Sequence, residues 1–256
     1  MIRKSICILA FLMLGAVTLH ADEGTLSVSP AVVMLKGSIG QSTTQRMTIV
    51  NATSHALAFD MVAKDVVVEN GKRVLTDAGR IAGSVANTAV FSPKSLALAP
   101  GEKRTVDVTV TVPPNPAARG VVALFQGKTK LQGNGMQVTA SLGTLLTFAL
   151  SDNATAEATA LVVKPPTATS NLNVAQNLSN VGSEPVLAQG MLAILSQSGT
   201  LVAKEAMVPR RLLPGEKIGM TADYDGELPA GRYRALVTYV LQNDKTLTSS
   251  AEFDVR

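Results

Sequence analysis

The chain has 256 residues, 46% of them hydrophobic, and carries 23 Lys and Arg against 19 Asp and Glu, a formal charge of +4. Since domains usually contain roughly 100–200 residues, one large or two ordinary domains are expected. With no Trp, three Tyr and no run of five like charges, the sequence lacks the basic, aromatic-lined platform that binds nucleic acid, so we expect no nucleic-acid partner.

The first residues have the pattern of a secretory signal peptide. Arg3 and Lys4 precede an apolar run of 12 residues, 6–17, and the small residue Ala21 follows it. A helix needs about 20 apolar residues to span a bilayer, so this run is too short. We expect residues 1–21 to be removed on export to the periplasm or the cell surface, with a retained N-terminal anchor as the alternative.

The mature chain, from residue 22 onward, lacks the only cysteine, Cys7, so a disulfide cannot form. Removal of the two basic residues of the signal leaves a nearly neutral chain of 21 basic and 19 acidic residues. No later apolar run is long enough to span a membrane. The stability of the mature protein must therefore come from a buried core.

Alternating apolar and polar residues dominate the mature chain. Between 103 and 112, valines from position 106 onward alternate with Thr and Asp, a period of two that indicates a half-buried strand. Asn70-Gly71 predicts a tight hairpin, because both residues readily adopt positive φ. Many short strands with few helical patterns predict an all-β fold of β-sandwiches. The other strand-like runs lie at 43–51, 56–68, 120–126, 233–240 and 247–255.

One stretch occurs twice. LAPGEK (98–103) and LLPGEK (212–217) each make a turn and open a strand, and a Pro-Ala turn and a second apolar strand follow in both places. This order predicts two copies of one sandwich module, that is, two immunoglobulin-like domains. We expect them at 22–152 and 153–256, with the boundary in the polar stretch SDNATAEA. The second copy predicts inward-facing side chains at Ile218, Met220, Ala222 and Tyr224.

The segment GMQVTASLGTLLTFALS, residues 135–151, alternates for longer than any other and contains no charge. The fifteen residues from 136 to 150, at about 3.3 Å each, extend close to 50 Å, whereas a typical strand measures roughly 17–20 Å. Exposed edge strands are usually blunted by charge or proline. The segment is therefore either the last core strand of domain one, bent across both sheets, or an edge that pairs with another chain.

The first domain resembles the periplasmic pilus-chaperone (PapD-like) family and related exported proteins with a chaperone-like first domain. The resembling segments are LSVSPAVVMLKG (26–37), TTQRMTIVN (43–51), LAPGEK with its valine strand, VP…ARG (112–120) and the long strand before the linker. The resemblance implies two sandwiches with a cleft between them. It also implies that the last strand of domain one supplies alternate apolar side chains to an incomplete subunit, here among Met136, Val138, Ala140, Leu142, Leu146 and Phe148.

The chain departs from that family at one point. The family typically holds the terminal carboxylate of its subunit with an Arg on the first strand and a Lys on the last. Here 30–33 reads Pro-Ala-Val-Val, and the last strand contains no Lys. A role in an usher pathway therefore does not follow from the resemblance alone.

The sequence offers little for catalysis. His55, the one histidine of the mature chain, lies in a predicted loop, and no GxSxG, GxxxxGK[ST], HExxH or Cys/His metal spacing occurs. We expect neither an enzyme nor a bound cofactor or metal. The leading expectation is an exported chaperone-like protein that shields subunits of a surface appendage by strand pairing. A surface protein that binds a cell-wall polymer is the alternative, and a hydrolase using His55 is the weakest.

Overall fold

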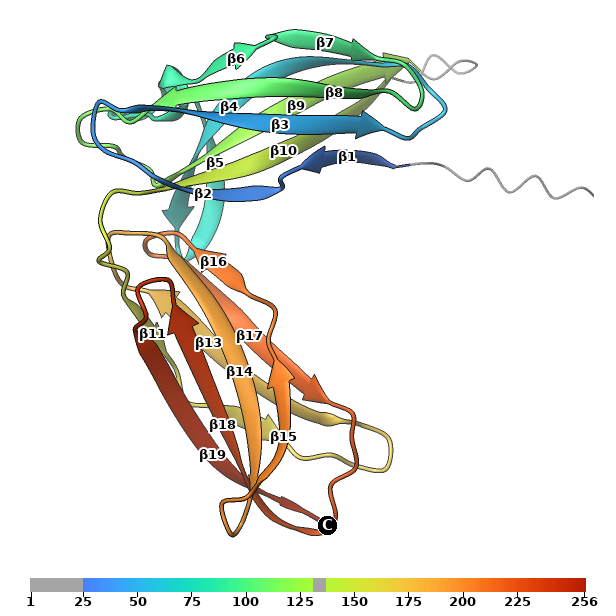
Figure 1. Cartoon of the computed structure of the whole chain (residues 1–256), viewed down its shortest axis with the longest axis vertical. Coiled ribbons are helices and arrows are strands. Elements are labelled where there is room, and N and C mark those ends of the chain that lie inside the picture. Colours follow the sequence, from blue (N-terminus) through green and yellow to red (C-terminus); the bar gives the residue numbers. More distant parts are fainter. Residues whose placement is uncertain (1–24, 131–136) are drawn as a thin grey trace, which may run out of the picture.

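A computed structural model describes residues 25–130 and 137–256, and within them the chain consists of strands and one short 3-10 helix. The strands form four sheets, two before residue 150 and two after residue 155, which pack as two β-sandwiches (Figure 1). The all-β, two-sandwich prediction is confirmed. The expected signal peptide lies outside the described residues. The described part of the chain contains no helix with the length and apolar character needed to cross a bilayer.

The first sandwich consists of a four-stranded and a six-stranded sheet. The first sheet has the order β1 (Leu26–Ser29), β3 (Ser42–Asn51), β8 (Lys103–Thr111) and β6 (Val90–Ser92). The second has the order β2 (Val32–Lys36), β10 (Gln137–Ala149), β9 (Gly120–Lys130), β4 (Leu57–Glu69) and β5 (Lys72–Asp77), with β7 (Ser95–Leu98) also paired to β4. The 3-10 helix η1 (Ala86–Thr88) precedes β6.

The opening segment 26–37 forms two strands that belong to different sheets. β1 pairs with β3, whereas β2 pairs in parallel with the end of β10. The break falls at Pro30-Ala31, where proline has no N–H to donate to a ladder. The chain therefore crosses from one sheet to the other between these strands.

The core of the first sandwich lies between its two sheets. Val106, Val108 and Val110 of β8 are 0–1% exposed and face aromatic residues of the other sheet, including Phe59 and Phe125. Burying a side chain of this kind stabilises a fold by roughly 1.5–3 kcal/mol. The valine strand predicted from its alternation thus supplies one face of the core.

The second sandwich repeats this plan. In one sheet β13 (Leu172–Asn180) pairs with β11 (Ala156–Ala158) and β12 (Val162–Lys164) and with β17 (Lys217–Tyr224). The other has the order β15 (Leu201–Ala206), β14 (Val186–Ser196), β18 (Gly231–Leu241) and β19 (Thr246–Val255), with β16 (Arg210–Leu212) paired to β14. On β17, Met220 and Ala222 are buried, and Ile218 and Tyr224 pack against the same core, as the alternation predicts.

The duplicated stretch forms the same turn in both sandwiches. Gly101 and Gly215 have φ of 73° and 79°, a conformation that glycine adopts without steric cost. The N–H of Gly101 donates to the carbonyl of Asn51 (2.7 Å), and that of Gly215 donates to the carbonyl of Asn180 (3.0 Å). These matched hydrogen bonds confirm that the sequence repeat reflects a structural repeat.

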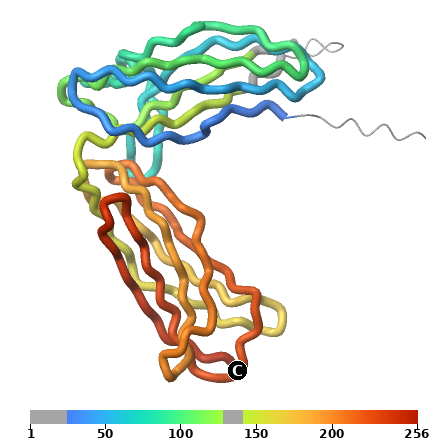
Figure 2. Tube along the Cα trace, viewed as in Figure 1, coloured from blue at the N-terminus to red at the C-terminus, as the bar shows by residue number. Residues whose placement is uncertain are grey.

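The two sandwiches lie at an angle to each other, and the chain passes between them once, through 150–155 (Figures 1 and 2). The β4–β5 hairpin extends from the first sandwich toward the second (Figure 1). Its turn has Asn70 at φ 52° and Gly71 at φ 78°, and Glu69 pairs with Lys72, which confirms the predicted tight hairpin.

Candidate functional site

One edge of β10 is only partly covered. On one edge, β10 pairs with β9 from Gln137 to Thr147. On the other edge β2 pairs only with Leu145 to Ala149. Among the described residues no strand pairs with that edge between Gln137 and Gly143. We call this segment the open edge.

The direction of the backbone groups shows which residues the open edge presents. The N–H of Leu145 points away from β9 and donates to the carbonyl of Ala31 (2.9 Å), whereas the N–H of Phe148 points toward β9 and donates to Arg119 (2.9 Å). The register with β9 is continuous from 137 to 147. Because backbone groups alternate along a strand, Thr139, Ser141 and Gly143 direct both N–H and C=O outward at the open edge.

The residues expected to contact a partner divide into three groups. Met136 lies outside the described residues. Val138, Ala140 and Leu142 lie on β10 opposite Thr129, Gly127 and Phe125 of β9, next to the open edge, and the side chain of Leu142 is half-buried.

The expectation that Leu146 and Phe148 contact a partner is wrong. They are 0% and 2% exposed and pack in the core of the first sandwich, so their side chains cannot reach a partner while the sandwich is closed. The alternation of 135–151 is uniform, but β2 covers its second half. The second half of the strand is therefore a core strand of one sheet, whereas the first half has an open edge, and the pairing of that edge with another chain stays a prediction.

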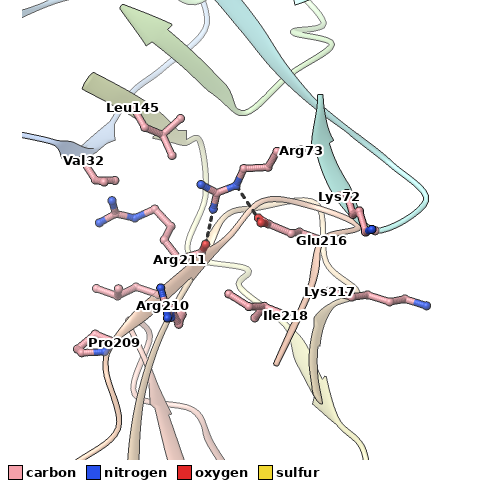
Figure 3. A pocket seen from close by; sticks show the side chains of 12 residues that line it. Val32, Lys72, Arg73, Leu145, Pro209, Arg210, Arg211, Glu216, Lys217 and Ile218 are labelled. Carbon is pink, nitrogen blue, oxygen red and sulfur yellow. Dashed lines mark hydrogen bonds and ion pairs between the residues drawn. The ribbon is translucent and has the colours of Figure 1, made fainter. Parts of the chain in front are cut away.

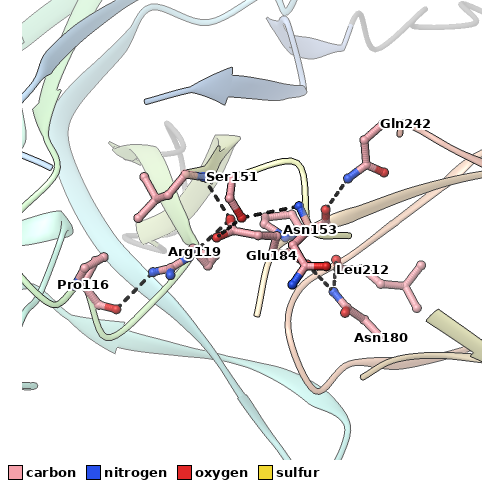
Figure 4. A network of polar contacts seen from close by, with 10 residues as sticks. Pro116, Arg119, Ser151, Asn153, Asn180, Glu184, Leu212 and Gln242 are labelled. Atoms are coloured by element: carbon pink, nitrogen blue, oxygen red, sulfur yellow. Dashed lines mark hydrogen bonds and ion pairs between the residues drawn. The ribbon is translucent and has the colours of Figure 1, made fainter. Parts of the chain in front are cut away.

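A buried carboxylate connects the second sandwich to the end of β10 (Figure 4). Glu184, in the loop between β13 and β14, accepts hydrogen bonds from the N–H of Leu150 (2.9 Å) and the hydroxyl of Ser151 (3.3 Å). Its carboxylate lies 3.6 Å from Nε of Arg119, and the two side chains are 4% and 19% exposed. The charge on Glu184 is thus paired across the domain junction, directly after the strand that carries the open edge.

The β4–β5 hairpin makes the second contact between the sandwiches. The carbonyl of Gly71 accepts a hydrogen bond from the N–H of Lys217 (3.0 Å), and Arg73 Nε lies 2.8 Å from the carboxylate of Glu216. A small apolar cluster of Val66, Leu145 and Leu213 lies beside these polar contacts. The junction therefore combines an ion pair, main-chain hydrogen bonds and apolar packing.

A cavity of about 570 Å³ lies at this junction (Figure 3). We call it the junction pocket. Residues of β2, β5, β16 and β17 contribute to its lining, together with Leu145, which follows the open edge on β10. Its charged lining residues are Lys72, Arg73, Arg210, Arg211, Glu216 and Lys217.

The positive charge of the junction pocket comes from elements that the sequence did not suggest. The resemblance implies an Arg within 30–33 and a Lys on the last strand, but these two elements contribute Val32 and Leu145 to the lining. The cations come instead from the β4–β5 hairpin, from β16 and from Lys217 at the start of β17. The adjacent pair Arg210-Arg211, just before LLPGEK (212–217), is the only sign of these cations in the sequence, and its place beside the first domain depends on the tertiary structure.

The remaining candidate, His55, is exposed in the loop between β3 and β4. Its main-chain carbonyl accepts a hydrogen bond from Asn51 (2.8 Å), which closes that loop. Across residues 25–130 and 137–256, no three His, Cys, Asp or Glu side chains are grouped as a metal ion would require.

No protein-family model matches the sequence, and no curated protein matches it. Among solved structures, the chain is similar to a chain of the chaperone–tip adhesin complex of CFA/I fimbriae, with 12% identity, a TM-score of 0.45 and coverage of 89% of this chain and 98% of that one. It is also similar to the Escherichia coli chaperone DraB, with 13% identity, a TM-score of 0.42 and coverage of 91% and 96%.

A further similar structure is the CsuC–CsuE chaperone–tip subunit pre-assembly complex from the chaperone-usher Csu pili of Acinetobacter baumannii. There the identity is 11%, the TM-score 0.42 and the coverage 89% and 98%. These solved structures are of pilus chaperones or of their complexes, and the likeness is one of overall fold.

Proposed function

We propose that this chain is an exported, non-enzymatic chaperone-like protein that shields a partner polypeptide by pairing with it along the open edge of β10. The observation that carries the proposal is the outward direction of Thr139, Ser141 and Gly143 on a strand whose other edge is fully paired. A polypeptide strand that adds there gains main-chain hydrogen bonds without any change in the sandwich.

The composition of the open edge supports pairing with a partner. Folded proteins usually protect exposed strand edges with charged residues, proline or bulges, because an unprotected edge promotes aggregation. The open edge reads QVTASLG and has no charge and no proline, and its register with β9 shows no bulge. An unprotected edge in an exported protein is a liability unless a partner covers it.

The class of partner follows from the resemblance of the first domain to pilus chaperones. We infer that the partner is a protein subunit of a surface appendage that lacks a strand of its own. Such a subunit has unpaired main-chain groups and uncovered apolar side chains where its strand is missing. The open edge would supply the hydrogen bonds, and the half-buried Leu142 beside it would supply apolar contact. Neither the described residues nor the similar structures support a cell-wall polymer as the ligand.

The proposal is tested by removing one outward N–H. Ser141→Pro removes an N–H that the fold does not use, and proline is tolerated at strand edges where the N–H faces solvent. Ser141→Ala is the matched control, since it changes the same side chain and keeps the N–H. We expect the proline variant to retain the circular dichroism and melting temperature of the wild type but to recover less than about a tenth as much partner from the exported fraction.

Hydrogen exchange gives a second, independent measurement. In the free protein the amides of Thr139, Ser141 and Gly143 should exchange quickly, and those of Ala140 and Leu142, which face β9, should be protected. Addition of the co-purified partner should slow amide exchange at Thr139, Ser141 and Gly143. Equal partner recovery with Ser141→Pro and Ser141→Ala, or no change in exchange at the open edge, would refute strand pairing.

A further inference from the structure

The open edge ends beside the point where the first domain passes from one sheet to the other. β1 pairs in the first sheet, β2 pairs with β10 in the second, and Pro30 and Ala31 join them. We call these two residues the connecting segment. The carbonyl of Ala31 accepts a hydrogen bond from the N–H of Leu145 (2.9 Å), two residues after Gly143. The connecting segment therefore closes the edge of β10 directly after the open edge.

A buried hydroxyl group holds the connecting segment in place. Oγ1 of Thr144 donates to the carbonyl of Pro30 (2.7 Å), which is the one hydrogen bond of this hydroxyl among the described residues. Thr144 is 0% exposed, and a hydroxyl that is removed from water needs such a partner. Pro30 belongs to no strand, so its carbonyl has no partner in a ladder. The hydroxyl of Thr144 therefore supplies the donor that this carbonyl would otherwise lack.

A second threonine of β10 makes a similar bond in a different setting. Oγ1 of Thr147 donates to the carbonyl of Val33 (2.9 Å), and Thr147 is also 0% exposed. Val33, however, lies within β2, where the parallel ladder continues on both sides of it. Loss of the Thr147 hydroxyl would leave that ladder intact. Loss of the Thr144 hydroxyl would leave a single hydrogen bond between the connecting segment and β10 among the described residues.

The connecting segment and an added strand would use the same hydrogen-bonding group. Backbone groups alternate along a strand, so the outward N–H that follows Gly143 belongs to Leu145, and Ala31 occupies it. While the connecting segment stays in place, a strand that adds to the open edge pairs no further than Gly143. A carbonyl that loses its donor inside the protein costs free energy, which favours its movement into solvent. Loss of the Thr144 hydroxyl should therefore free the N–H of Leu145.

We propose that Thr144 is a positioning residue that sets the end of the open edge. By holding Pro30 it keeps Ala31 on the N–H of Leu145, and so it limits how far along β10 a partner strand can pair. The inference rests on the proposed function for the partner strand alone. The position of the boundary is a property of the free protein and can be measured without a partner.

The first test measures amide hydrogen exchange residue by residue in the purified protein. Thr144→Val removes the hydroxyl and keeps the shape of the side chain. We expect the amide of Leu145 to exchange at least about tenfold faster in this variant than in the wild type, because the carbonyl of Pro30 has lost its donor. Thr147→Val is the matched control on the same strand, and it should leave the exchange of Leu145 within about threefold of the wild type.

A second pair of variants separates the hydroxyl from the packing around it. Thr144→Ser and Thr144→Ala both remove the methyl group, but only the alanine variant loses the hydroxyl. The serine variant should keep the exchange of Leu145 within about threefold of the wild type, whereas the alanine variant should exchange at least about tenfold faster. This pair decides the question if Thr144→Val does not fold. Equal exchange of Leu145 in the serine and alanine variants, or an equal effect of Thr144→Val and Thr147→Val, would overturn the proposal.

An added strand gives a readout that a purely structural role of Thr144 would not change. The probe is a synthetic alternating peptide, acetyl-Lys-Val-Thr-Val-Thr-Val-Lys amide, at saturating concentration. In the wild type it should slow exchange along the open edge, and at Leu145 no more than at Thr147, which reports general stabilisation. In Thr144→Val it should also restore slow exchange at Leu145, because the peptide takes the place of Ala31.

The peptide experiment separates the two proposals. Extra slowing at Leu145 in the wild type, beyond that at Thr147, would show that an added strand displaces the connecting segment, and the role of Thr144 would be rejected. A peptide that slows no amide of the open edge would count against strand pairing. In that case the exchange of Leu145 in the free variants still decides whether Thr144 sets the boundary.

Discussion

Two tyrosines in the core of the second sandwich differ in the hydrogen bonding of their hydroxyl groups. Tyr233 donates to the carbonyl of Pro229 at 2.8 Å, a bond back to the preceding turn that is common in immunoglobulin-like folds. Tyr239 is 0% exposed, and its hydroxyl has no hydrogen-bond partner among the described residues. Burial raises the pKa of Tyr239 to about 12, because the charged phenolate is poorly solvated there. The two hydroxyl groups should therefore affect stability with opposite sign.

Replacing each tyrosine by phenylalanine tests this difference. Tyr233→Phe removes a satisfied hydrogen bond and should lower the free energy of unfolding by about 1 kcal/mol. Tyr239→Phe removes a buried hydroxyl without a partner and should leave that free energy unchanged or raise it by up to about 1 kcal/mol. Urea unfolding at pH 8 measures both, and a loss of equal size in the two variants would contradict the assignment.

Tyr239 should also affect stability in alkaline solution. In the unfolded chain a tyrosine has a pKa of about 10, so the unfolded state releases its proton at a lower pH than folded Tyr239 does. Since the folded state then holds more protons, the stability that Tyr239 contributes is complete below about pH 10 and decreases as the pH rises toward 12. Urea midpoints between pH 9 and 11.5 should fall less for Tyr239→Phe than for the wild type.

At the scale of elements, the repeated turn is held by equivalent side chains in both sandwiches. Nδ2 of Asn51 donates to the carbonyls of His55 (2.8 Å) and Ala99 (3.1 Å). In the second sandwich Nδ2 of Asn180 donates to the carbonyls of Glu184 (2.8 Å) and Leu212 (3.1 Å). Each asparagine thus joins the end of its strand to the neighbouring loop and to the segment before the Pro-Gly turn. Neither asparagine stands out in the sequence, because asparagine at a strand end is common.

Asn180→Ala should be strongly destabilising for this reason. Asn180 is 1% exposed, and its loss leaves two buried carbonyls without a donor, which should lower the free energy of unfolding by about 2 kcal/mol or more. Asn177→Ala, an exposed change on the same strand β13, should stay within about 0.5 kcal/mol of the wild type. Similar urea midpoints for the two variants would show that the turn does not depend on this side chain.

The long strand β10 shows what local pattern can and cannot predict. Its length and alternation are visible in the sequence, and the structure has an unbroken strand from Gln137 to Ala149. The same alternation cannot tell Leu142, half-buried beside the open edge, from Leu146, which is completely buried. The difference depends on how far β2 extends along the edge, and β2 lies more than a hundred residues earlier in the chain.

At the scale of the whole molecule, two ion pairs connect the sandwiches. Glu184 pairs with Arg119, and Arg73 pairs with Glu216, in both cases across the junction and with at least one partner largely buried. Interfaces between domains of one chain are otherwise usually small and permit relative motion. These pairs should therefore keep the angle between the open edge and the junction pocket constant.

The double variant Arg73→Ala, Glu184→Gln should loosen the junction. Loss of the Glu184 charge leaves the partly buried Arg119 without a counter-ion, which should lower the free energy of unfolding by about 1–3 kcal/mol. We expect a larger radius of gyration in small-angle X-ray scattering, and separate melting of the two sandwiches in calorimetry. The control, Arg234→Ala with Glu252→Gln, breaks a pair whose side chains are 54% and 59% exposed and should change neither measurement. An unchanged radius in the first variant would show that apolar packing alone holds the angle.

The all-β class, the hairpin at Asn70-Gly71 and the repeat of the module can be predicted without a structure, because a period of two and the residue preferences of tight turns are local properties of the chain. Three features depend on the tertiary structure: β2 pairs only with Leu145 to Ala149 of β10, Leu146 and Phe148 belong to the core, and Arg73, Arg210 and Arg211 line the junction pocket with Val32. These features bring together residues far apart in the chain, and their positions depend on how complete sheets pack, which no local pattern records.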